Sequence, residues 1–181
     1  MTSSNAYKYG RSLIALHWLM FFLLIFVYAV IEFRVLFDKG MPEREFMKSL
    51  HFMFGLLVLL LVLFRLVARR LNPRPPPHSS EGWYKLLHIA SQVGHWALYA
   101  FMLGMPLMGW MALSAAGKPI PFFGLVMPAL IGPDETLSKQ LKSLHETAGS
   151  LGYILIGVHV LAAFFHQFVL KDSLMTRLRW R

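Results

Sequence analysis

The sequence contains no cysteine among its 181 residues. This absence excludes disulfide bonds, metal sites built from thiolates, and covalent attachment of haem through a C-x-x-C-H motif. Charge is also scarce, because only 15% of the residues are Asp, Glu, Lys or Arg, while 56% are hydrophobic. The mean hydropathy is +0.53. A soluble domain of this size rarely has such a composition, so the sequence indicates a multi-pass membrane protein.

Acidic residues are few, and the formal net charge is therefore +9. A basic balance of this kind is also found in nucleic-acid-binding proteins. Here, however, the basic residues flank apolar segments instead of forming one surface stripe. Basic residues at the ends of apolar segments are typical of membrane proteins, so we predict contact with the lipid bilayer and no nucleic-acid partner.

Four apolar segments predict helices at about residues 11–33, 46–69, 84–113 and 138–170. A helix needs about 20 residues to cross the ~30 Å hydrocarbon core, and each segment reaches that length with its flanks. The first segment is too long for a signal peptide, and no A-x-A cleavage site follows it, so we expect it to be retained. The predicted fold is an all-α integral membrane four-helix bundle that forms a single domain over residues 1–181.

Prolines mark two further features between and within these segments. Pro106 predicts a kink in the third helix. The stretch "NPRPPPH", residues 72–78, predicts a stiff connector in which His78 faces water. The connection 114–138 contains "GLVMPALIGP", which is too short to span the membrane and predicts an interfacial or re-entrant piece.

The distribution of basic residues predicts the topology. Cytoplasmic loops of membrane proteins carry an excess of Lys and Arg. Eleven of the 18 basic residues fall in the first tail, the second connection and the last tail: Lys8, Arg11, Arg65, Arg69, Arg70, Arg74, Lys85, Lys171, Arg177, Arg179 and Arg181. Both termini are therefore predicted to lie in the cytoplasm.

Seven of the eight histidines lie in or beside the predicted helices. Ionisable groups inside a bilayer are costly and usually mark a function. His145 and His159 are 14 residues apart, which places both on one helix face, separated by about 21 Å. By depth, His17 on the first helix lies level with His159, and His51 on the second lies level with His145. The spacing predicts two histidine pairs at two levels of the bundle.

Paired neutral imidazoles can ligate zinc, copper or haem iron. Neither level offers cysteine, and only Glu146 adds a nearby carboxylate, so a structural zinc site is disfavoured. Haem needs axial histidines, an apolar slot and small residues that give it room. Glycines lie near the histidines at Gly55, Gly149, Gly152 and Gly157. Two non-covalently bound haems are thus favoured over polar helix packing and over proton relays.

The predicted depths of the histidines in the membrane do not decide which histidine pairs with His17. His166 lies seven residues after His159 on nearly the same face. His95 on the third helix is also predicted at the cytoplasmic level, with His88 seven residues before it. Both could take the place of His159 as the partner of His17.

The motifs around these residues resemble those of the bacterial cytochrome b561 family, which is related to the cytochrome b subunits of hydrogenases and formate dehydrogenases. The matching stretches are "ALHWLMF", "SLHFMFG", "VGHWALY" and "LHETAGSLGYILIGVHVLAAFFHQ". The resemblance covers nearly the whole chain. It implies two haem b groups, with His17 and His159 as ligands of the inner haem and His51 and His145 as ligands of the outer one.

The sequence resembles the superoxide oxidase type of this family, and this resemblance also implies an activity in the bacterial inner membrane. Superoxide would be oxidised at the periplasmic side and ubiquinone reduced within the membrane. Superoxide is an anion, so Lys39, Arg44, Lys118, Lys139 and Lys142 on the outer connections are candidates for attracting it. His95 and His166 are candidate proton relays, and Trp83 and Lys85 are candidates for the quinone pocket.

Two alternative functions stay open from the sequence. The chain could be a haem-bearing anchor or electron-carrier subunit of a quinone-linked dehydrogenase, which would require a partner subunit; a homodimer is also compatible. A haem-free transporter could instead use the histidines as proton relays. A reducible b-type visible spectrum would exclude the second alternative.

Overall fold

The computed structural model describes residues 10–72 and 82–171. Its order is α1 (Arg11–Phe33), η1 (Arg34–Leu36), α2 (Pro42–Leu71), α3 (Gly82–Ala115), β1 (Ile120–Phe122), β2 (Leu125–Met127), α4 (Glu135–Phe164) and the π-helical η2 (Phe165–Leu170). Four helical stretches are long and apolar enough to cross a membrane. The prediction of an all-α membrane four-helix bundle is confirmed. Lys8, Arg74, His78, Arg177, Arg179 and Arg181 lie outside the described residues.

Two helices begin a few residues earlier than the apolar pattern predicts, because polar first turns extend them. Pro42 occupies the first turn of α2, followed by Glu43 and Glu45, and both residue types suit a helix N-terminus. The Asp134 side chain accepts a hydrogen bond from the backbone N–H of Leu137, 2.9 Å away, and so caps α4. Neither polar first turn carries the apolar periodicity that located the helices.

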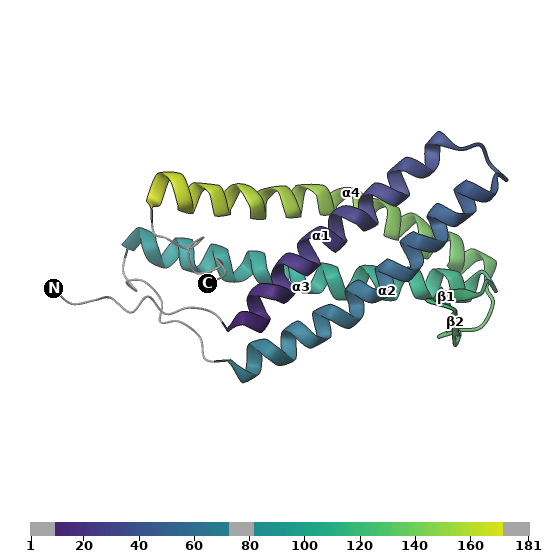
Figure 1. Ribbon diagram of the computed structural model, residues 1–181, viewed down its shortest axis with the longest axis horizontal. Helices are drawn as coiled ribbons and strands as arrows, with labels where there is room; N and C mark the ends of the chain where they lie inside the picture. The colour runs from purple at the N-terminus through teal and green to yellow at the C-terminus, as the bar shows by residue number, and fades with distance from the viewer. Residues whose placement is uncertain (1–9, 73–81, 172–181) are drawn as a thin grey trace.

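The helices form two antiparallel pairs, α1 with α2 and α3 with α4, and α2 also packs along α3. Figure 1 shows the start of α1, the end of α2, the start of α3 and the end of α4 gathered at one end of the bundle, which we name the terminal end. The β-strands lie at the opposite end, which we name the hairpin end. α1 therefore begins, and α4 ends, at the terminal end.

The apolar core lies among the first three helices. Its buried residues are Met20, Leu23 and Val27 of α1, Val58 and Val62 of α2, and Tyr99 and Met102 of α3. In α4 the one buried residue is Gly152. Within the described residues α4 packs closely on α3 and does not pack closely along α1 or α2. Individual side chains therefore reach from α4 across to the α1–α2 pair.

The connection after α3 forms a two-stranded antiparallel hairpin. Phe123 and Gly124 make its turn with φ angles of 47° and 87°, the left-handed pair that tight hairpins require. Trp110 donates a hydrogen bond from Nε1 to the carbonyl oxygen of Pro128, 2.9 Å away. Phe123 also meets Phe54 of α2, with ring centroids 5.4 Å apart. The first residues of the segment predicted as interfacial or re-entrant thus belong to a hairpin that contacts α2 and α3.

Candidate functional site

Two pairs of histidines bridge the interval between α4 and the α1–α2 pair. His17 of α1 and His159 of α4 have ring centroids 6.3 Å apart and an interplanar angle of 66°. We name them the terminal-end pair. His51 of α2 and His145 of α4 have centroids 6.1 Å apart at 84°, and we name them the hairpin-end pair. The structure brings together both pairs that the sequence predicts.

Both pairs use the same face of α4. His159 is 14 positions after His145 in a continuous helix, which corresponds to about 21 Å along the axis and nearly four whole turns. All four imidazoles are half-buried. The result is two separate sites, stacked along the bundle instead of side by side.

The hydrogen bond of His51 fixes which of its ring nitrogens is free. Its Nδ1 lies 3.1 Å from the carbonyl oxygen of Val27. A carbonyl oxygen only accepts, so Nδ1 carries the proton and donates. The lone pair of Nε2 is then available to a metal, which is the arrangement that ligating histidines commonly have.

Small residues make room beside the α4 histidines. A Cβ at Gly109 of α3 would lie 3.3 Å from Cε1 of His145, so a larger residue there would press on the imidazole. A Cβ at Gly152 would overlap the Tyr28 hydroxyl and the ring of Phe101. At Gly55 and Gly157 an added Cβ would meet no atom within 4 Å. Gly109 and Gly152 therefore allow side chains of neighbouring helices to approach the backbone closely, whereas Gly55 and Gly157 face open space.

The spacing of each pair fits two axial ligands on one iron. A ligating imidazole nitrogen lies about 2.0 Å from its metal and about 1.1 Å from its own ring centroid, so opposed rings have centroids about 6.2 Å apart. The observed separations are 6.3 and 6.1 Å. No group of three or more metal-binding side chains occurs in the described parts of the chain. Two imidazoles are the number that a six-coordinate haem requires, because the porphyrin supplies four nitrogens.

The candidate relay and quinone residues lie at the terminal end. The ring centroid of His95 is 5.5 Å from that of His159, and its Nδ1 lies 2.6 Å from the carbonyl oxygen of Ser91. The structure thus brings His95 beside the terminal-end pair. His166 is in η2, half-buried and in ring contact with Phe165. Trp83 and Lys85 are exposed in the first turn of α3.

Sequence reasoning missed a cation beside the terminal-end pair. Arg65 of α2 donates from Nε to the hydroxyl of Tyr99, 3.3 Å away, and from Nη1 to the carbonyl oxygen of Leu13, 3.4 Å away. The Cζ atom of Arg69 lies 5.4 Å from the centroid of the Tyr99 ring. The sequence contains one feature that could have indicated this position of Arg65. Arg65 follows His51 by 14 residues, the same interval that separates His145 from His159.

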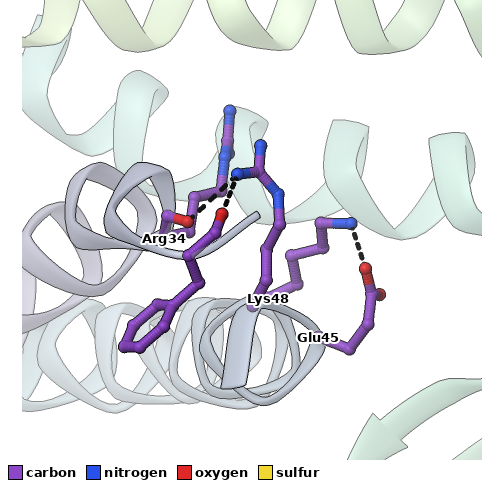
Figure 2. Close-up of polar contacts among 5 residues, drawn as sticks. Arg34, Glu45 and Lys48 are labelled. Carbon is purple, nitrogen blue, oxygen red and sulfur yellow. Dashed lines mark hydrogen bonds and ion pairs between the residues drawn. The ribbon is translucent and has the colours of Figure 1, made fainter. Parts of the chain in front are cut away.

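Several of the cations predicted to attract superoxide have partners. Figure 2 shows Arg34 beside the first turns of α2 and the ion pair between Lys48 and Glu45. The Nζ of Lys48 lies 2.5 Å from Oε1 of Glu45. The Nη1 of Arg44 donates to the carbonyl oxygens of Arg34 and Phe37, at 3.2 and 2.6 Å. Two more of these cations, Lys139 and Lys142, form ion pairs with Glu135 and Glu146. Among the described residues, Lys39 and Lys118 form no ion pair.

Residues 8–179 match the family model described as prokaryotic cytochrome b561. The chain belongs to this family. It is 34% identical over 176 residues to the probable superoxide oxidase CybB of Yersinia pestis, covering 94% of this chain and 95% of that protein. It is 30% identical over 176 residues to cytochrome b561 homolog 1 of Escherichia coli K12, covering 94% and 96%. Cytochrome b561 homolog 2 of the same organism is 26% identical over 172 residues, covering 94% and 90%.

Membership carries consequences for the class of protein. Cytochromes b561 are membrane helical bundles that bind haem b and transfer electrons. This family member is therefore a multi-pass membrane cytochrome of the oxidoreductase class.

Proposed function

We propose that the chain binds two haem b groups, one at each histidine pair, and conducts electrons between the two ends of the bundle. The observation that carries this proposal is the pair spacing of 6.3 and 6.1 Å at two levels of one α4 face. Haem held by two histidines has no open axial position, so it supplies one-electron transfer. His17 and His159 would hold the inner group, and His51 and His145 the outer one.

The charges support an orientation with the terminal end in the cytoplasm and the hairpin end in the periplasm of a bacterial inner membrane. The described carboxylate residues all belong to segments in the hairpin half: Glu32, Asp38, Glu43, Glu45, Asp134, Glu135 and Glu146. Arg65, Arg69, Arg70 and Lys85 lie toward the terminal end. By the positive-inside rule, this distribution supports the proposal that both termini lie in the cytoplasm.

The proposed reaction oxidises superoxide outside and reduces ubiquinone near the inner pair. The name of the Yersinia relative, a probable superoxide oxidase, supports this choice. Each superoxide releases one electron and becomes dioxygen, and two electrons with two protons convert the quinone to quinol. Lys39 and Lys118 are exposed at the hairpin end and suit attraction of an anion.

Residues at the terminal end suit quinone reduction. The Nδ1 of His95 is held by the carbonyl oxygen of Ser91, so its Nε2 is available to pass a proton. His166 is a second proton-relay candidate. Trp83 and Lys85 are proposed to contact the quinone headgroup, since both are exposed where α3 begins. A single domain over residues 1–181 would contain all of these groups.

Measurement on the isolated chain tests the proposal. We expect purified protein to show a reducible b-type spectrum, two haems per polypeptide, and superoxide-dependent reduction of ubiquinone. Fewer than two haems would contradict the cofactor assignment. Two haems without superoxide-dependent reduction would instead favour an electron-carrier subunit, and co-purification of a dehydrogenase would then identify its partner.

A further inference from the structure

Arg65 joins three helices at the level of the terminal-end pair. Its guanidinium donates to Tyr99 on α3 and to the backbone of Leu13 on α1. Leu13 precedes His17 by four residues, and Tyr99 follows His95 by four, so each partner lies about one helical turn from a histidine. These two contacts place the Arg65 guanidinium at the level of the terminal-end pair.

No carboxylate neutralises this charge within residues 10–72 and 82–171. The ion pairs there involve Glu45, Glu135 and Glu146, and none includes Arg65 or Arg69. The described hydrogen-bond partners of Arg65 are a hydroxyl and a backbone carbonyl, both neutral. Arg65 is half-buried, so its charge is screened less than that of a fully exposed residue.

The charges near the hairpin-end pair differ from those near the terminal-end pair. Glu146 follows His145 directly in α4 and pairs with Lys142, 3.7 Å away. The charge of Arg34 acts on His51. Charges of both signs therefore surround the hairpin-end pair, whereas the described charges nearest the terminal-end pair are positive.

We propose that Arg65 makes haem at the terminal-end pair more easily reduced than haem at the hairpin-end pair, and so sets the direction of electron transfer. This inference rests on the proposed function, because it requires haem at both levels. Reduction of ferric iron removes one positive charge, so a nearby cation stabilises the reduced form and a carboxylate stabilises the oxidised form. One electron moves from the hairpin level to the terminal level, and no proton moves with it.

Redox titration of the purified holoprotein tests the inference. Arg65→Gln should retain both haems and make the higher-potential one at least tenfold harder to reduce, which is a fall of 59 mV for one electron. The other potential should stay unchanged. Arg65→Lys, which keeps the charge, should restore most of the difference. Arg70→Gln removes the same charge from an exposed site on α2 and should change neither potential.

A second measurement does not depend on the Arg65 variants. His17→Ala should remove the higher-potential haem, and His145→Ala the lower-potential one. Loss of the lower-potential haem from His17→Ala would overturn the inference, as would unchanged potentials in Arg65→Gln with both haems bound. Either result leaves two haems in the unmodified protein, whereas failure of the proposed function would appear as fewer than two.

Discussion

The hydroxyl of Tyr28 on α1 donates a hydrogen bond to the carbonyl oxygen of Gly149 on α4, with the two oxygens 2.8 Å apart. Nearby, the hydroxyl of Tyr153 on α4 donates to Oε1 of Glu32 on α1, 2.9 Å away. The two tyrosine rings have centroids 4.5 Å apart. On α4, this contact lies between His145 and His159, so it fixes the helix that carries one ligand candidate of each pair.

A substitution at Gly152 should loosen this contact. In Gly152→Ala the added Cβ overlaps the Tyr28 hydroxyl and the ring of Phe101, and overpacking of this kind costs about 1–3 kcal/mol. We expect a lower thermal unfolding midpoint in detergent. The control is Gly104→Ala on α3, where an added Cβ meets no atom within 4 Å. An equal loss of stability in both variants would show that the close contact at Gly152 is not the cause.

Replacement of single histidines should remove single haems. His159→Ala and His17→Ala should each leave one haem, and so should their combination, because both are proposed to hold the same group. His51→Ala and His145→Ala should remove the other. The measurement is haem content per polypeptide by absorption. His88→Ala, at an exposed position that bonds Gln92, is the control and should keep both. Two haems in His159→Ala would disprove the pairing.

Attraction of superoxide should depend on the unpaired cations at the hairpin end. Lys118→Gln should lower the second-order rate constant roughly two- to fivefold at low salt, because the approach of an anion is steered by exposed positive charge. The difference should shrink at high ionic strength, where exposed charges are screened. Lys139→Gln is the matched control, since Lys139 already pairs with Glu135 at 2.7 Å. Equal rates for the two variants at every salt concentration would exclude this role for Lys118.

The cap of α4 should contribute to stability without touching either histidine pair. Asp134→Ala removes the acceptor for the Leu137 N–H, and loss of such a cap costs about 1 kcal/mol. Asp134→Asn keeps an acceptor oxygen and should cost less. Thermal unfolding in detergent distinguishes the two variants. If Asp134→Asn lost as much stability as Asp134→Ala, the charge and not the hydrogen bond would be what stabilises the start of the helix.

The sequence predicts the bundle and the histidine pairs because both depend on simple periodic geometry. The 14-residue interval between His145 and His159 places two imidazoles on one face whatever the neighbouring helices do. Depth along each helix then matches His17 with His159 and His51 with His145. The role of these residues as haem ligands stays a prediction.

Other features depend on contacts that no single segment specifies. Depth alone could not separate His95 from His159, and in the structure both lie at the terminal-end level, 5.5 Å apart. The hairpin turn at Phe123 and Gly124 was missed because a phenylalanine at positive φ is uncommon. The sequence alone identifies Arg65 only as a topology signal, because its contacts with Leu13 and Tyr99 come from two other helices.

The fourth helix contributes almost nothing to the shared apolar interior, and this has a consequence for how the molecule matures. Newly inserted chains could assemble the first three helices from their own side chains, while the last one would be held in place by the cofactors proposed at the two histidine pairs. Cells short of iron porphyrin should then accumulate a form whose final helix is readily attacked by membrane proteases. Cofactor supply would thereby govern how long each copy survives.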